Sequence, residues 1–152
     1  HGVAYRDRRS LLLEKVLMMK SLWTDEEASF EGEHLRLEPS WARPKPKQRP
    51  HPPILMGAAA GPKTLADIVE FCDGWIPLGN RHDIVDTVSR VRRAVEEAGR
   101  DPDAFDVTAF AVKPDHIEEL QRAGVDRAIF SVPPIGRDDV IPRLDRLASA
   151  IG

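Results

Sequence analysis

The sequence predicts an α/β fold in which four strand–helix units follow one another. From Ile54 onward, short apolar runs alternate with amphipathic helical patterns. The apolar runs show little polar alternation, so we expect parallel strands with helices packed against them. A complete (β/α)8 barrel takes roughly 250 residues, whereas this chain has 152. The sequence therefore predicts half of such a barrel, preceded by a helix and a small β-hairpin.

The first third of the chain has a different pattern. Apolar residues at helical spacing predict an amphipathic helix from Arg8 to Trp23. Two short alternating runs within residues 28–37 flank a Glu-Gly pair, which predicts a hairpin. The segment from Pro39 to Pro53 is rich in proline. Because proline removes a backbone donor and fixes φ, we expect this segment to be an extended connector.

The four units are delimited by glycine and proline. Pro62 suits the first turn of a helix, and Gly99 and Gly124 are expected to end helices. Pro142 is expected to shift or tighten the start of the last helix. The predicted strands are 54–57, 74–78, 105–112 and 127–132, and the predicted helices are 62–71, 82–98, 114–123 and 138–151. We expect one partial domain over residues 1–152, with a helix in 1–23, the hairpin and connector in 24–53 and the four units in 54–152.

Composition excludes several classes of function. The formal charge is -3 and charges of both signs are mixed throughout, which argues against a nucleic-acid-binding face. The apolar stretches are shorter than the ~18 residues of a membrane-spanning helix, and no signal-peptide pattern is present, so we expect a cytoplasmic protein. A single cysteine, Cys72, cannot form an internal disulfide and is expected to be buried. Because the chain begins at His1 without a methionine, we expect a fragment of a longer protein.

The most informative loop follows the first predicted strand. Its residues are Gly57, Ala58, Ala59, Ala60, Gly61, Pro62, Lys63 and Thr64. Small side chains leave the backbone uncovered, and the next helix offers unpaired N–H groups and a positive dipole end, an arrangement that binds phosphate. Lys63 or Thr64 can add a side-chain contact. Close packing between a strand and a helix explains the same small residues equally well, and the sequence leaves both interpretations open.

No other polar group assembles into a recognisable centre. Histidines 34, 51, 82 and 116 do not fall at metal-ligand spacing, so we expect no metal site. Asp73 precedes a glycine and is expected to cap the turn into the second strand. Neither a Ser-His-Asp set nor a pair of carboxylates can be assembled from the sequence. The catalytic residues stay unknown at this level.

Several short motifs, taken in order, resemble one known family. They are Ser21-Leu22-Trp23-Thr24, Ser29-Phe30-Glu31-Gly32-Glu33-His34, the connector 43–50 leading to 52–57, Cys72-Asp73-Gly74-Trp75 and Ala98-Gly99-Arg100-Asp101-Pro102. Over nearly its whole length the sequence resembles the C-terminal part of luciferase-like monooxygenases, most closely the branch of coenzyme F420-dependent oxidoreductases. The resemblance implies a TIM-type barrel whose strands five to eight are the four strands predicted above.

The resemblance also implies a cofactor and its position. In relatives, the loop matching Gly57 to Thr64 approaches the phosphate-bearing tail of coenzyme F420 or, alternatively, of FMN. Residues 79–81 and 131–133 would line the same mouth. The flavin or deazaflavin ring is held mainly by the first four strands, which this chain lacks. The resemblance therefore implies that the chain alone does not catalyse.

Three hypotheses follow for the function. The chain is the cofactor-tail half of an oxidoreductase that acts on a small organic substrate once an N-terminal half is present. Alternatively, it is a non-catalytic truncated relic that dimerises through open strand edges. Thirdly, it is a small phosphate-binding α/β module without redox activity. All three place the binding site at residues 57–64.

Overall fold

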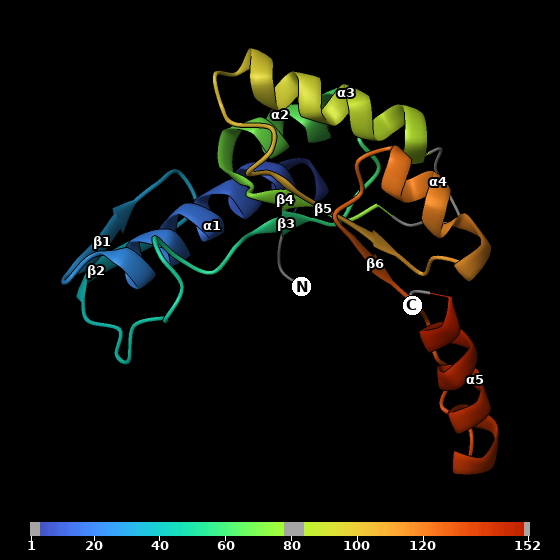
Figure 1. The fold of residues 1–152 in the computed structure, drawn as a ribbon. Coiled ribbons are helices and arrows are strands. Elements are labelled where there is room, and N and C mark those ends of the chain that lie inside the picture. Colours follow the sequence, from blue (N-terminus) through green and yellow to red (C-terminus); the bar gives the residue numbers. More distant parts are fainter. Residues whose placement is uncertain (1–3, 78–83, 151–152) are drawn as a thin grey trace. The chain divides into compact units, whose positions relative to one another are not determined.

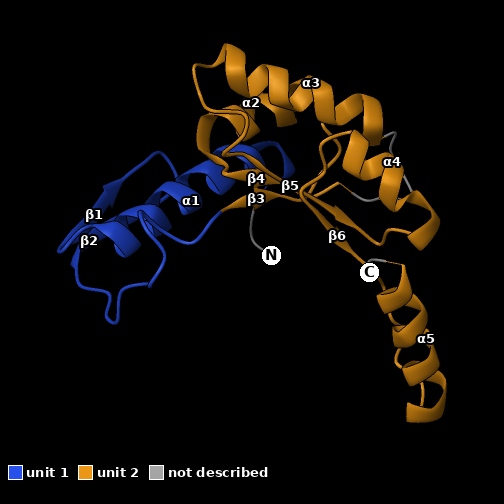
Figure 2. Ribbon diagram, viewed as in Figure 1, with its two compact units in different colours: residues 1–53 blue, residues 54–152 orange. Residues whose placement is uncertain are grey.

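The computed structural model describes residues 4–77 and 84–150. Within it, the chain divides into two compact units, residues 1–53 and residues 54–152 (Figure 2). The boundary falls where the proline-rich connector meets the first predicted strand. That residues 1–152 form a single partial domain stays a prediction.

Unit 1 contains one long helix and a two-stranded hairpin. The short 3₁₀ turn η1 (Tyr5–Asp7) leads into α1 (Arg8–Thr24), which ends one residue after the predicted Trp23. Strands β1 (Ala28–Glu31) and β2 (Arg36–Ser40) pair antiparallel, which confirms the hairpin. The connector was expected to begin at Pro39, but β2 extends to Ser40. Because β2 has only β1 as a neighbour, the missing N–H of Pro39 is tolerated there.

A carboxylate from α1 fixes the turn of this hairpin. Glu14 accepts hydrogen bonds from the backbone amides of Glu33 at 2.8 Å, His34 at 2.9 Å and Leu35 at 2.8 Å. Desolvation acts to raise the pKa of Glu14, but these amides outweigh it and the pKa lies below the ordinary 4.5. A Cβ atom at Gly32 would lie 2.5 Å from this carboxyl group. The turn therefore needs glycine next to the carboxylate.

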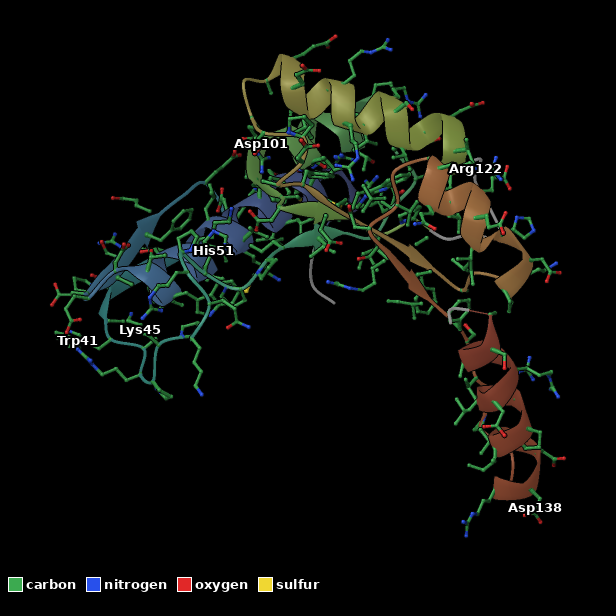
Figure 3. The ribbon with its side chains drawn as sticks, in the orientation of Figure 1. Trp41, Lys45, His51, Asp101, Arg122 and Asp138 are labelled. Atoms are coloured by element: carbon green, nitrogen blue, oxygen red, sulfur yellow. The ribbon has the colours of Figure 1, made fainter. Side chains whose placement is uncertain are left out.

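The proline-rich connector is attached to the end of α1. Lys45 points back toward α1, and its ammonium group donates to the carbonyl oxygen of Leu22 at 2.7 Å (Figure 3). The same group donates to the carbonyl oxygen of Asp25. These carbonyls belong to the last helical turn and its cap, where a cation is favourable. The extended connector is thus held by a side chain rather than by a strand ladder.

Unit 2 is built on a parallel sheet of four strands in sequential order. The strands are β3 (Leu55–Met56), β4 (Gly74–Trp75), β5 (Asp106–Phe110) and β6 (Arg127–Ile129). Each strand pairs with the next one along the chain, and all three pairings are parallel. Sequential parallel order is that of (β/α)8 barrels. The predicted fold class, half of such a barrel, is confirmed.

Helices follow the strands as predicted, with small differences at their ends. They are α2 (Pro62–Phe71), α3 (Ile84–Glu97), the 3₁₀ turn η2 (Pro114–His116), α4 (Ile117–Arg122) and α5 (Arg137–Ser149). The bounds of α2 match the prediction. Residues 78–83, which include the predicted start of the second helix, lie outside the described residues. None of the helices in the described part of the chain is long and apolar enough to cross a bilayer.

The core lies between the sheet and three helices on one of its faces (Figure 1). Ile68 of α2, Val88, Val91 and Val95 of α3, and Leu120 of α4 belong to one buried cluster together with Trp75, Val107 and Ala109 of the strands. Because side chains alternate along a strand, Thr108 and Phe110 belong to the opposite face. Phe110 is 41% exposed and Ile129 is 36% exposed. Within unit 2 the helices therefore cover only one face of the sheet.

Two glycines and an arginine fix the ends of the helices. Gly99 and Gly124 have φ values of 74° and 86°, which a glycine adopts without strain. This confirms both as helix terminators. The guanidinium group of Arg100 donates to the carbonyls of Val69 at 3.0 Å and Cys72 at 2.7 Å. It thereby satisfies carbonyls that the end of α2 leaves unpaired.

The last helix differs from the others in its packing. None of the side chains of α5 is buried, and Ile141 and Leu144 are 46% and 44% exposed. The helix begins at Arg137, one residue before the predicted start, and Asp138 lies in its first turn (Figure 3). Pro142 lies inside the helix and does not move its start further along the chain.

Candidate functional site

The loop of residues 57–61 joins the carboxyl end of β3 to the start of α2. In parallel α/β sheets, ligands bind at the carboxyl ends of the strands, where loops lead into helices. β3 ends at Met56 and α2 begins at Pro62, with Gly61 as the N-cap residue. The predicted loop thus lies at the end of the sheet where a ligand is expected.

Both glycines of the loop stand in open space. A Cβ atom built at Gly57 or at Gly61 would meet no described atom within 4 Å. At Gly61 the φ value is -73° and the ψ value is 170°, a conformation that any residue adopts. Close packing between strand and helix therefore does not explain these glycines. Of the two interpretations that the sequence left open, this geometry favours the approach of a ligand.

The loop offers several backbone donors. Within the described part of the chain, the amide of Gly61 donates to Ala59 O at 2.9 Å, and the amide of Leu65 donates to Gly61 O at 2.9 Å. The amides of residues 58–60, 63 and 64 donate to no backbone carbonyl there. Those of Lys63 and Thr64 belong to the first turn of α2, which has no intrahelical acceptor for them. Their positive dipole end favours an anion.

Thr64 provides a second indication of a ligand. Among the described residues, the buried polar side chains are those of Thr64, 8% exposed, and Thr108, 2% exposed. The hydroxyl of Thr108 is bonded to Asp106, whereas that of Thr64 has no hydrogen-bond partner in the described part of the chain. No fully enclosed polar atom lacks a partner there, so the Thr64 hydroxyl keeps contact with solvent. Cα–Cβ bonds in a helix tilt toward its N-terminus, so the Cβ atom of Thr64 leans toward the loop.

Two side chains outside the predicted set, one from β4 and one from α3, donate hydrogen bonds to the loop. The indole N–H of Trp75 in β4 donates to Ala58 O at 2.7 Å. The guanidinium group of Arg90 in α3 donates to Ala60 O at 2.9 Å. Sequence reasoning missed both residues. The one available signal was that a tryptophan buried in a strand needs an acceptor for its N–H group.

The structure describes only some of the other residues predicted to line the cofactor site, 79–81 and 131–133. Residues 79–81 lie outside the described residues. Ser131 lines a cavity of about 830 Å³ that Lys113, Asp115, Arg143 and Arg146 also line. No residue of the loop 57–64 lines this cavity.

The remaining polar candidates are structural. The carboxylate of Asp73 accepts a hydrogen bond from the amide of Ile54 at 2.8 Å and thereby joins the starts of β3 and β4. Cys72 is fully buried and forms no disulfide among the described residues, as predicted. His34 and Ser10 lie 2.7 Å apart in unit 1, between Nε2 and Oγ. In the described ranges, no three histidine, cysteine or acidic side chains gather as metal ligands.

Sequence comparison places relatives of this chain among oxidoreductases. An uncharacterised protein of Mycobacterium tuberculosis (strain ATCC 25618 / H37Rv) is 38% identical over 99% of this chain and 54% of its own length. An F420-dependent hydroxymycolic acid dehydrogenase of the same strain is 29% identical over 64% of this chain and 26% of its own. An FMNH2-dependent dimethylsulfone monooxygenase of Pseudomonas putida is 29% identical over 80% and 33%. The chain spans about half the length of the first of these relatives.

Solved structures share the fold. The monooxygenase RslO1 of Streptomyces bottropensis matches 97% of this chain and 46% of its own, with 22% identity and a TM-score of 0.59. The coenzyme F420-dependent tetrahydromethanopterin reductase of Methanopyrus kandleri matches 90% and 62%, with 18% identity and a TM-score of 0.60. The family model of luciferase-like monooxygenases matches residues 1–130. The chain belongs to the luciferase-like monooxygenase family.

Proposed function

We propose that this chain is the C-terminal portion of a flavin- or F420-dependent oxidoreductase and that residues 57–64 bind the phosphate-bearing tail of the cofactor. The observation that carries the proposal is the open loop at the end of β3, with unpaired amides and the unpartnered hydroxyl of Thr64. A phosphate group is an acceptor for both kinds of donor. Lys63 is exposed in the first turn of α2 and adds a positive charge there.

The chemistry of the whole enzyme is monooxygenation or hydride transfer on a small organic substrate. The bound cofactor supplies the redox chemistry, and the protein supplies binding and orientation. This chain contributes the donors that hold the charged tail of the cofactor. Relatives use F420 in one case and FMNH2 in another, and we place coenzyme F420 first and FMN second. We propose that the chain is inactive without an N-terminal half.

Glycine 61 provides a direct test of the site. In Gly61→Leu, the new side chain enters open space in an unstrained backbone and blocks the approach of an anion. The matched control is Gly136→Leu, because Gly136 is also an N-cap residue in open space, with φ -60° and ψ 161°. The measurement is the ratio of the Kd of riboflavin, which lacks the phosphate, to the Kd of FMN, by titration calorimetry.

The expected ratio follows from the energy of the phosphate contacts. A hydrogen bond to a charged group contributes about 1.5–3 kcal/mol, and 1.4 kcal/mol corresponds to a factor of about ten. We expect a ratio of about ten or more for the natural chain and for Gly136→Leu, and a ratio near one for Gly61→Leu. The same comparison with F420 and its chromophore without the phosphodiester tail distinguishes the two cofactors. Equal ratios in Gly61→Leu and the natural chain would refute the site.

Complementation distinguishes the enzyme from the two alternatives. The chain is produced together with the N-terminal half of the 38%-identical Mycobacterium tuberculosis relative. The enzyme hypothesis predicts that FMN or F420 binding tightens markedly in the combined protein. A relic predicts a stable dimer of this chain and unchanged binding. A small phosphate-binding module predicts that inorganic phosphate binds as well as either cofactor does.

A further inference from the structure

The loop of residues 57–61 is held by two hydrogen bonds from elsewhere in unit 2. Trp75 belongs to β4 and is fully buried, and Arg90 belongs to α3. Each donates to a carbonyl of the loop, Trp75 to Ala58 and Arg90 to Ala60. These partners are 17 and 30 residues apart in sequence. The loop conformation is therefore imposed by the tertiary fold rather than by the loop's own sequence.

The direction of the Ala58 carbonyl determines the direction of the next amide, that of Ala59. The described cis peptide bonds both precede prolines, so the peptide between Ala58 and Ala59 is trans. In a trans peptide the C=O and N–H groups point in opposite directions. Because Ala58 O points to the buried indole of Trp75, the amide of Ala59 points away from it. Ala59 is exposed, and its amide has no backbone acceptor among the described residues.

The second hydrogen bond acts on the next turn of the loop. Arg90 holds Ala60 O at 2.9 Å, and the following amide, that of Gly61, closes onto Ala59 O at 2.9 Å. This closure places Gly61 at the N-cap of α2, immediately before the free amides of the first turn. Arg90 keeps four of its five N–H donors for other partners. It also brings a positive charge to the loop.

We propose that Trp75 and Arg90 are positioning residues for the anion site, orienting the loop so that the amide of Ala59 and the first turn of α2 face the phosphate. This inference rests on the proposed function of residues 57–64. Neither side chain needs to touch the ligand. Their contribution is preorganisation, which lowers the entropic cost of binding by holding the donors in place beforehand.

The test compares variants by the ratio of the Kd of riboflavin to that of FMN in the complete 152-residue chain. This ratio isolates the phosphate contribution, because general damage to the fold weakens both ligands alike. Arg90→Met removes the donor, and Arg90→Lys retains a donor and the charge. Arg90 is exposed, so neither change is expected to unfold the chain, and circular dichroism checks this.

Trp75→Phe removes the indole N–H without changing any charge. The ratio is expected to fall roughly threefold to tenfold in Arg90→Met and Trp75→Phe, the equivalent of one neutral hydrogen bond. It is expected to recover in Arg90→Lys. A fall of the Kd ratio in Trp75→Phe is an effect of loop orientation and not of charge, because this change, unlike Arg90→Met, leaves the charge of the chain unaltered. Phenylalanine leaves a cavity in the core. If Trp75→Phe does not fold for this reason, the comparison of Arg90→Met with Arg90→Lys decides the test.

Nuclear magnetic resonance supplies a signature that a purely structural role would not give. On titration with FMN, the resonances of the Ala59 amide and of the Trp75 indole N–H are expected to change their chemical shifts together. On titration with riboflavin, both chemical shifts are expected to stay unchanged. A ratio near one in the natural chain overturns both the positioning role and the proposed site. A high ratio that Arg90→Met and every folded Trp75 variant retain overturns the positioning role alone.

Discussion

Ile68 and Ile141 form a matched pair for measuring how much each helix contributes to stability. Ile68 in α2 is fully buried in the core cluster, whereas Ile141 in α5 is 46% exposed. Replacing either by alanine removes the same atoms and gains the same small helix propensity. The difference between Ile68→Ala and Ile141→Ala therefore reports burial alone.

The magnitudes follow from the exposed fractions. Burying an isoleucine side chain contributes about 1.5–3 kcal/mol, and the cavity left behind raises the cost of Ile68→Ala to about 2–5 kcal/mol. For Ile141→Ala, at an exposed position, we expect a change of about 0.5 kcal/mol or less. In a chain of this length, 1 kcal/mol shifts the melting midpoint by roughly 2–4 °C. Ile68→Ala should therefore melt at least about 4 °C lower.

Urea unfolding followed by circular dichroism measures both changes. The midpoint should fall for Ile68→Ala with an unchanged slope, because a change in stability alone moves only the midpoint. Ile141→Ala should follow the curve of the natural chain. Equal losses at the two positions would refute this reasoning, since they would mean that α5 is packed in solution as tightly as α2.

Two further substitutions test close contacts inside the units. Gly74→Ala places a Cβ atom 2.5 Å from Asp106 O and 2.9 Å from the Leu55 side chain, and because backbone must then shift, we expect a loss of roughly 1–3 kcal/mol in urea unfolding. Gly57→Ala, in open space, should cost less than about 1 kcal/mol, and equal losses would contradict the contact. Glu14→Gln removes a carboxylate whose pKa is lowered in the fold. Its stabilisation is present above the ordinary value of 4.5 and is lost as the pH falls through the lowered value. The natural chain should therefore exceed Glu14→Gln in stability at pH 7, with a difference that shrinks below about pH 4.5; a difference independent of pH would contradict this.

The elements predicted correctly are those whose signals are local. Pro62 marks the start of α2, and Gly99 and Gly124 follow α3 and α4 with positive φ values. A first-turn proline and a C-terminal glycine act through backbone sterics within one turn, so the sequence reveals them. The sequence also predicts that an α-helix starts at Pro114, but Pro114 opens a 3₁₀ turn. The boundary there depends on how the chain leaves β5.

The loop itself was predicted, but its supports were not. Gly57 to Thr64 could be recognised because small residues before a first-turn proline are a local pattern. Trp75 and Arg90 reach the loop across the sheet and from a neighbouring helix. No spacing in the sequence relates them to Ala58 or Ala60, because their contacts exist only after the strands have paired. The choice between packing and ligand binding likewise required the space around Gly57 and Gly61.

The two faces of β5 are subject to different constraints. Val107 and Ala109 are fully enclosed against the helices, so a change in their volume alters the core. Asp106, Thr108 and Phe110 alternate onto the other side of the ribbon. Of these, Thr108 is only 2% exposed and its hydroxyl is bonded to Asp106, whereas Phe110 is 41% exposed, so a change at Phe110 can vary polarity and shape while the packed layer stays intact. One strand thus carries both enclosed residues, which the packed layer constrains, and an exposed residue, which it does not.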